Sequence, residues 1–343
     1  MNLFKLFTRQ TRISSPLHAR FGSTFESLVP PGDGSLALFS LSNDIFCNQA
    51  LDSHLAENVK NHRLRSVLLL WISEPCIVLG RHQNPWLECH VKQAMNEQVK
   101  VVRRFSGGGC VYHDRGNLNI SFICDRSKYD RQANLALIKN ALSKLEFSGD
   151  IGFEITPRHD IFIRKANNLF KLSGSAARLA QNFAYHHCTL LFDANMSNMQ
   201  LLRSNLASSI RTKATPSVRS KCLNLKEFST DSSLNLMRIG EKLCEEYWRK
   251  QAGSWSIEHL FNYIRPEDDH ELMLKLEPFH TELTSWQYVY GATPKFDLIV
   301  EIGDETASQM HEITLSITNG IIREHKTKTG SSSETLKTAL DSL

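Results

Sequence analysis

The sequence predicts an α/β (α+β) fold, a mixed β-sheet with flanking helices. Apolar segments of strand length recur along the chain, and residues 66–72 are the clearest of them. Apolar residues at helical spacing separate some of these segments, as in residues 232–248, whereas the pair Asn319-Gly320 joins two others directly. Because strands joined through helices and strands joined by hairpins occur in one chain, we expect a mixed sheet covered by helices.

The first half of the chain supplies most of the expected sheet. Residues 36–41 are predicted to form a strand, and Asn43 or Asp44 can cap a helix that continues through Leu55. The Gly-rich run that begins at Arg103 is expected to join two strands as a hairpin. The other strands predicted here are 66–72, 76–80, 99–103, 118–124, 153–156 and 161–164, and the other helices are 90–97 and 134–147.

The second half is predicted to end in a small α+β unit. Residues 186–196 are expected to form a strand, 196–210 a helix, and 232–248 a long amphipathic helix. Residues 257–282 are mixed and polar, so no element is assigned to them. The final unit is predicted to contain strands 296–301, 311–317 and 321–326, with a hairpin turn at Asn319-Gly320, and a short helix at 331–343.

Length and composition limit the class of protein. A chain of 343 residues with 41% hydrophobic residues can bury a sizeable core and allows about two domains. The net charge of +4 does not indicate nucleic-acid binding, and no apolar run approaches the roughly 20 residues of a membrane span. The eight cysteines form no CxxC pair, which favours free thiols in a reducing compartment.

The N-terminal segment differs from the rest of the chain. Lys5, Arg9, Arg12 and Arg20 precede the first acidic residue, Glu26, and serine and threonine are frequent among them. Leucines and phenylalanines near the start could form one apolar helix face. This composition is typical of a mitochondrial transit peptide, and the Pro/Gly cluster at 30–34 suggests a linker behind it. Residues 1–35 are therefore left out of the predicted fold.

Two stretches carry the residues suited to chemistry. Gly107, Gly108 and Gly109 follow two arginines, and a glycine loop can bring backbone N–H groups close to an anionic ligand. Lys171 leads a second run of small residues, where it supplies a compact positive charge. Cys188 beside two histidines raises the alternative of a Cys–His nucleophile, although a thiol in a strand is more often a packing residue.

Six motifs resemble the lipoate–protein ligase and mitochondrial lipoyltransferase (lipoyl amidotransferase) family. They are RRFSGGGCVYHDRGNLN at 103–119, GRHQNPW at 80–86, KLSGSA at 171–176, HHCTLL at 186–191, SVRSKCLNL at 217–225 and WQYVYGATPKF at 286–296. The resemblance spans about residues 36–300 in the family's order. Cys188 stands where the ligases mostly have glycine, Cys222 stands at a valine position, and the C-terminal tail is shorter than the family's accessory domain.

The resemblance implies a biotin/lipoate ligase-like catalytic domain at 36–250, followed at 251–343 by a connecting segment and a short accessory domain. It implies a lipoyltransferase that moves a lipoyl group, from lipoyl-AMP or from the lipoylated glycine-cleavage H protein, to the acceptor lysine of lipoyl domains of 2-oxoacid dehydrogenase complexes. An ATP-dependent lipoate ligase, which would need Mg and ATP, and a non-catalytic binding protein remain the alternatives. We expect a mitochondrial matrix monomer with no tightly bound cofactor and no metal.

The resemblance also assigns the site residues. Lys171 would be the catalytic residue, stabilising charge on the carbonyl and phosphate oxygens. The expected contacts of the lipoyl-adenylate are Arg104, Gly107, Gly108, Gly109, Tyr112, Asn119, Arg158, Asp160, Lys171, Thr189, Val218 and Ser220. Leu79, Val111, Gly107 and Gly108 could line the slot for the acyl chain, and His82, Asn84 and His113 are candidate pocket residues. The acyl donor, the acceptor preference, the selectivity between lipoyl and octanoyl groups and the general base stay open.

Overall fold

A computed structural model describes residues 19–21, 24–30, 34–252, 261–302 and 311–327 of the chain. The expected helix at 331–343 and most of the expected transit peptide lie outside these residues. None of the helices within the described ranges is both long and apolar enough to cross a membrane.

The centre of the fold is a seven-stranded mixed sheet, so the predicted fold class is confirmed. Its order is β1 (Ala19–Phe21), β14 (Phe261–Ile264), β2 (Ser35–Ser40), β3 (Ser66–Trp71), β7 (Asn117–Asp125), β12 (Phe183–Leu191) and β11 (Ser175–Leu179). The first four strands run parallel to one another, and the pairings from β3 onward are antiparallel.

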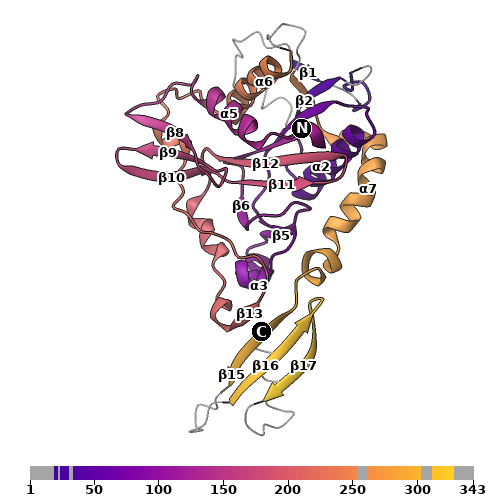
Figure 1. The fold of residues 1–343 in the computed structure, drawn as a ribbon, viewed down its shortest axis with the longest axis vertical. Helices are drawn as coiled ribbons and strands as arrows, with labels where there is room; N and C mark the ends of the chain where they lie inside the picture. Colours follow the sequence, from indigo (N-terminus) through magenta and orange to yellow (C-terminus); the bar gives the residue numbers. More distant parts are fainter. Residues whose placement is uncertain (1–18, 22–23, 31–33, 253–260, 303–310, 328–343) are drawn as a thin grey trace, which may run out of the picture.

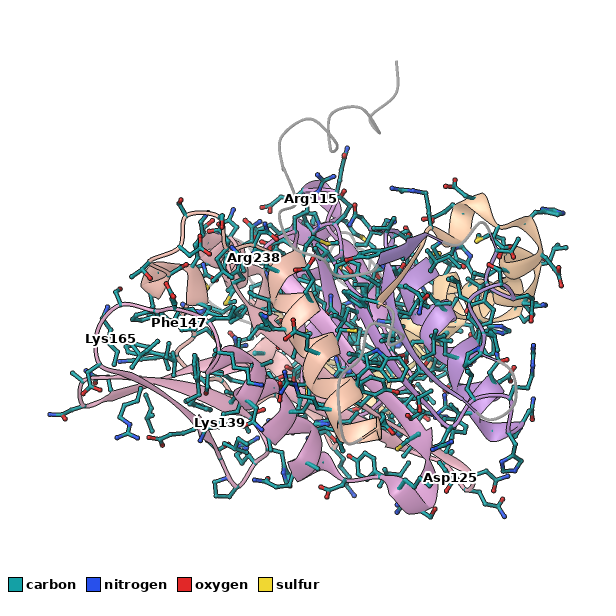
Figure 2. The ribbon with its side chains drawn as sticks, turned by 90° about the horizontal axis from the view of Figure 1, so that it is seen from above. Arg115, Asp125, Lys139, Phe147, Lys165 and Arg238 are labelled. Atoms are coloured by element: carbon teal, nitrogen blue, oxygen red, sulfur yellow. The ribbon has the colours of Figure 1, made fainter. Side chains whose placement is uncertain are left out.

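Alternate residues of the central strands build two cores, one on each face of the sheet. Leu68 and Leu70 of β3 face the helices α5 (Arg131–Leu142) and α6 (Leu236–Ala252). Leu69 and Trp71 face α2 (Ile45–Lys60) and α7 (His270–Thr284). The Asp44 side chain caps α2 by accepting from the N–H groups of the first turn. Figure 2 shows α6, which carries Arg238, crossing one face of the sheet, with Lys139 of α5 on the same side.

Two three-stranded sheets flank the central sheet. One has the order β5 (Lys100–Arg103), β4 (Cys76–Leu79), β6 (Val111–His113), and the other β10 (Asn168–Ser173), β9 (Ile161–Lys165), β8 (Ile151–Ile155). The predicted Gly-rich hairpin is wrong, because β5 and β6 do not pair with each other. They lie on opposite sides of β4, so the glycine loop has to cross the end of β4.

The C-terminal sheet extends away from this body (Figure 1). Its order is β13 (Ile210–Thr212), β15 (Phe296–Ile302), β16 (His311–Thr318) and β17 (Ile321–Thr327). The predicted turn between β16 and β17 is confirmed, with φ angles of 55° at Asn319 and 70° at Gly320. The face of the sheet that carries Leu298 and Leu315 packs against Trp86 and Leu87 of the body.

Short elements make the connections. They are α3 (Pro85–Glu88), α4 (Val91–Asn96), the 3₁₀ turns η1 (Arg126–Lys128), η2 (Met196–Leu202), η3 (Ala207–Ser209), η4 (Leu225–Phe228) and η5 (Pro266–Asp268), and the π-helical turn η6 (Gln287–Gly291). The helix predicted at 196–210 is therefore wrong. This polar stretch lacks an apolar helical face, and it forms 3₁₀ turns before entering β13.

The large body extends past the expected limits of the catalytic domain at both ends. β14 and α7, which follow residue 250, belong to the central sheet and to its α2 side. Within the segment expected to be transit peptide and linker, β1 pairs with β14, and the Phe25 and Leu28 side chains are buried in the core. Chain segments at the two ends of the sequence thus complete one core, which local composition does not reveal.

Candidate active site

The glycine loop, residues 106–110, lies against the end of β4. A Cβ atom placed on Gly80 would lie 2.0 Å from the Gly108 carbonyl oxygen, so only glycine fits there. Gly108 itself has a φ of +90°, in the region that favours glycine. A Cβ on Gly107 would meet nothing within 4 Å, so this position opens away from the protein.

Arg104 supports the loop from below. Its guanidinium donates to the carbonyl oxygens of Val78 at 3.0 Å, Gly107 at 2.7 Å and Gly109 at 2.7 Å, and the residue is 6% exposed. Burial lowers the pKa of the Arg104 side chain to about 10. With its donors directed at carbonyl groups, Arg104 shapes the loop and does not point a free guanidinium at a phosphate, which was the expected role.

Arg103 joins three parts of the chain in the interior of the protein. Its fully buried guanidinium donates to the carbonyl oxygens of Arg81 and Gln83 in the turn after β4. On the other side it donates to the Val289 carbonyl at 2.8 Å and to the Thr293 hydroxyl at 3.0 Å. From the sequence, Arg103 was expected only to place a positive charge beside the glycine loop. The sequence signal for this structural role was the pair of adjacent arginines at the end of a strand, because the side chains of neighbouring strand residues point to opposite sides.

Lys171 lies in β10 and not in a turn of small residues. Its ammonium donates to the Asp160 carboxylate at 2.7 Å, and the two side chains are 21% and 11% exposed. The other Asp160 oxygen accepts from the Ser175 N–H at 3.2 Å. A Cβ on Gly174 would lie 3.3 Å from Lys171 Cε and 3.6 Å from Thr189 Oγ1. Two expected site residues, Lys171 and Thr189, therefore lie beside Gly174.

The segment at residues 217–225 links the lysine to the glycine loop. The Lys171 N–H donates to the Lys221 carbonyl at 2.7 Å, and the Leu223 N–H donates to the Lys171 carbonyl. At its other end the Ser217 hydroxyl accepts from the Cys110 N–H at 2.8 Å. Between these anchors Val218 and Ser220 are exposed, so the segment spans the site with its middle in solvent.

A row of polar side chains leads into the sheet beside Thr189. Asn119 of β7 lies opposite Thr189 of β12, and Asn117 donates to the Asn119 carbonyl oxygen at 3.2 Å. Asn119 Nδ2 is buried and has no hydrogen-bond partner among the described residues, which leaves its N–H groups for a ligand. Burial, followed by the charge of Arg104, lowers the pKa of His113 to about 3, so His113 is neutral, and its Nδ1 accepts from Asn117 Nδ2 at 2.9 Å.

A second polar chain on this face was missed by sequence reasoning. His187 Nε2 lies 2.8 Å from Asp52 Oδ2, and His187 Nδ1 lies 3.3 Å from the hydroxyl of Ser106, the first residue of the glycine loop. The imidazole stacks on Tyr185 at 4.5 Å. Asp52 is buried on α2, so only the tertiary fold brings it to the loop. Because Asp52 favours the proton on Nε2, Nδ1 is free to accept from the Ser106 hydroxyl and orient it.

The remaining expected residues fall into two groups. Leu79 and Tyr112 are buried, and the Tyr112 hydroxyl accepts from Asn198 at 2.7 Å. Val111 is half-buried, whereas Arg158 and His82 are exposed. Asn84 caps α3 by accepting from the Leu87 N–H, so its side chain supports the fold and does not face an open pocket. Within the described part of the chain, the buried Asn84 Nδ2 has no hydrogen-bond partner.

The Cys–His alternative does not survive in the structure. Cys188 is buried in the core on the α5 side of the sheet, with His186 Nε2 3.4 Å from its sulfur. Burial raises the pKa of the Cys188 thiol and lowers that of His186, so neither group is charged. A neutral buried thiol is a poor nucleophile and a good packing group. In the described part of the chain, no group of His, Cys, Asp and Glu side chains could hold a metal ion.

Comparisons with known proteins identify the family of this chain. The profile of the lipoyl protein ligase A/B catalytic domain matches residues 44–247, more than half of the chain. The mitochondrial lipoyl amidotransferase LIPT1 of Mus musculus is 35% identical over 295 residues, which cover 85% of this chain and 75% of that protein. Lipoate-protein ligase A of Bdellovibrio bacteriovorus is 31% identical over 258 residues, covering 74% and 73%.

Solved structures show the same fold. LipL1 of P. falciparum, solved in complex with lipoate, superposes with a TM-score of 0.60 at 24% identity, covering 86% of this chain and 84% of that chain. A bipartite lipoate protein ligase of Thermoplasma acidophilum, described with its E2 lipoyl domain, gives a TM-score of 0.57 at 16% identity, covering 79% and 98%. The chain therefore belongs to the lipoyl protein ligase A/B family and is an acyltransferase of protein lipoylation.

Proposed function

We propose that this enzyme transfers a lipoyl group from lipoyl-AMP to the ε-amine of an acceptor lysine on a lipoyl domain. Neighbouring contacts support this proposal: Gly174 lies against Lys171 and Thr189, and Thr189 pairs with Asn119 in the sheet. Gly108 of the glycine loop lies against Ala176, two residues after Gly174. The observation that carries the proposal is the position of Lys171, whose backbone N–H and carbonyl both bond to residues 221–223 of the segment at 217–225.

For this transfer, the protein has to position the two substrates and stabilise the negative charge that develops. The acceptor amine attacks the acyl carbonyl carbon, a C–N bond forms, the C–O bond to the phosphate breaks, and AMP leaves with the electron pair while the amine loses a proton. Negative charge grows on the carbonyl oxygen and on the leaving phosphate. Lys171 would stabilise both, and Asp160 holds the ammonium in position until the substrate arrives. Ser106, oriented by His187, would offer a further polar contact to the acyl group.

The source of the acyl group separates the proposal from the alternatives. With lipoyl-AMP, or with lipoylated glycine-cleavage H protein, the enzyme needs no ATP, whereas a lipoate ligase would activate free lipoate using ATP and Mg. The experiment is mass spectrometry of an apo lipoyl domain after incubation with each donor, beside ATP–pyrophosphate exchange driven by lipoate. Transfer from lipoyl-AMP without exchange supports the proposal. Strong exchange would replace it by the ligase function, and no transfer from any donor by a non-catalytic role.

The setting follows from the same proposal. The mammalian relatives are mitochondrial by name, and the basic, acid-free start of this chain fits import, so we place the enzyme in the mitochondrial matrix, where 2-oxoacid dehydrogenase complexes carry lipoyl domains. We propose that it acts as a monomer. A reporter fused to residues 1–35 that stayed in the cytosol would contradict the location.

A further inference from the structure

One stretch of the surface carries a strong and unbalanced positive charge. No acidic residue occurs between Asp193 and Glu227, although six lysines and arginines do. Lys226 pairs with Asp193 at 2.6 Å. The other five are all exposed, and none of them forms an ion pair within the described chain; they are Arg203, Arg211, Lys213, Arg219 and Lys221. We call these five side chains the basic strip.

Some other surface cations, by contrast, pair with carboxylates. Arg63 pairs with Glu26 at 2.7 Å, and Arg115 lies 2.5 Å from Glu74. Two carboxylates that border the basic strip are engaged by other groups. Glu88 is buried beneath the segment, where it accepts from the Ser217 N–H, and Asp297 lies opposite Arg211 in the sheet but accepts from the Ser316 hydroxyl. Five exposed cations without an ion pair in the described chain give this surface a positive field.

The basic strip connects the active site to the C-terminal sheet. Lys221 adjoins the strand of Lys171 through the backbone bond between them. Arg219 donates to the Leu202 carbonyl at 2.5 Å, which brings it beside Arg203. Arg211 lies within β13 and Lys213 directly follows it, and β13 is paired with β15. In Figure 1, β13 lies at the small sheet, well away from β10 in the large body.

This extent is too large for a small ligand. A single adenylate phosphate needs only a few donors near Lys171, and Arg211 and Lys213 are placed on the other sheet. A protein substrate, by contrast, must dock around the mouth of the site while its lysine reaches the activated acyl group. Resting on the proposed function, we infer that the basic strip is the docking surface of the acceptor protein. The acceptor would present an acidic surface beside its target lysine.

The test uses the two edges of the C-terminal sheet. Arg211→Glu with Lys213→Glu reverses two charges at the β13 edge, and Arg323→Glu with Lys326→Glu reverses two exposed charges at the opposite edge, on β17. Transfer from lipoyl-AMP to an apo lipoyl domain is measured across salt concentrations. We expect kcat/KM to fall at least tenfold for the β13 pair at low salt, a loss that shrinks as salt screens the charges, and to stay within twofold for the β17 pair.

Two controls keep the result specific. Hydroxylamine, a small uncharged nucleophile, replaces the acceptor and reports how lipoyl-AMP itself is handled. Its rate should be unchanged in the β13 pair, and a lipoyl domain with acidic residues reversed to lysine should regain transfer with that variant. Equal kinetics of the two edge variants, or an equal loss with hydroxylamine, would overturn the inference. Failure of the wild type to transfer at all would instead reject the proposed function. A glutamate at position 211 would face Asp297, and this repulsion could disturb the fold. Thermal melting, and the neutral variant Arg211→Gln with Lys213→Gln, separate such misfolding from a loss of docking.

Discussion

Gly80 and Gly108 touch so closely that no side chain fits between them. A Cβ on Gly80 would lie 2.0 Å from the Gly108 carbonyl oxygen, whereas the neighbouring Gly107 faces open space. The turn after β4 and the glycine loop are therefore one packed unit, even though 27 residues separate the two glycines in the sequence. Any acyl-adenylate that uses the loop amides depends on this contact.

Gly80→Ala should displace the glycine loop. Because the atom met by the new methyl group belongs to the backbone, overpacking of about 1–3 kcal/mol or more is expected in the free energy of unfolding. Gly107→Ala is the matched control, since its Cβ would meet nothing within 4 Å. Urea unfolding of both variants measures the change in the free energy of unfolding. An equal, small decrease in the two variants would show that the loop does not pack on Gly80.

Arg103→Met should destabilise the protein strongly. The substitution leaves several buried carbonyl oxygens without a donor, each worth about 1–3 kcal/mol, so we expect a loss of about 3 kcal/mol or more. Arg115→Met, which removes an exposed arginine beside Glu74, should change stability by less than about 1 kcal/mol. A denaturation midpoint of Arg103→Met close to that of Arg115→Met would show that Arg103 does not stabilise the three parts of the chain that it joins.

His113 should make the protein acid-sensitive. Its pKa is lowered to about 3 in the folded state, while the unfolded chain takes up the proton near the usual value of about 6.5. Between these values the unfolded state binds more protons, so stability falls as pH decreases from about 6.5 towards 3, by up to about 1.4 kcal/mol per pH unit. His113→Gln should remove the contribution of one titrating group from the pH dependence of the unfolding free energy. Part of the pH dependence should remain, because the pKa of His54 is also lowered, to about 4. Identical pH profiles for variant and wild type would reject the assignment.

The sequence predicted best those elements that local pattern determines. The strand at Ser66–Trp71 is a run of buried apolar residues, and the β16–β17 turn needs positive φ at Asn319-Gly320. It missed β14, because Phe261–Ile264 is a four-residue strand whose partner β2 lies more than 200 positions earlier. Local composition cannot indicate such a pairing.

In the candidate site, too, the sequence predicted some features and could not predict others. The motif resemblance named Lys171, Asp160 and Thr189, and the structure brings them together. Roles set by tertiary contacts were not foreseen. Arg104 looked like a ligand donor from its charge, yet it is buried on carbonyl groups, and the Asp52–His187 pair depends on a helix far away in the sequence. A charged residue in a motif can serve the loop as readily as the ligand.

Lys171 gives the most direct test of the account. The measurement is single-turnover transfer from purified lipoyl-AMP to an apo lipoyl domain, followed by intact mass, for the wild type, Lys171→Ala and Lys171→Arg. Lys226→Ala, which removes an exposed lysine paired with Asp193, is the control. Loss of the ammonium should slow transfer about 100- to 1,000-fold. Arginine should also be strongly impaired, since its planar fork needs a different position. Thermal melting should be unchanged in all variants. Near-normal transfer by Lys171→Ala at an unchanged melting temperature would remove Lys171 from the mechanism and contradict the account.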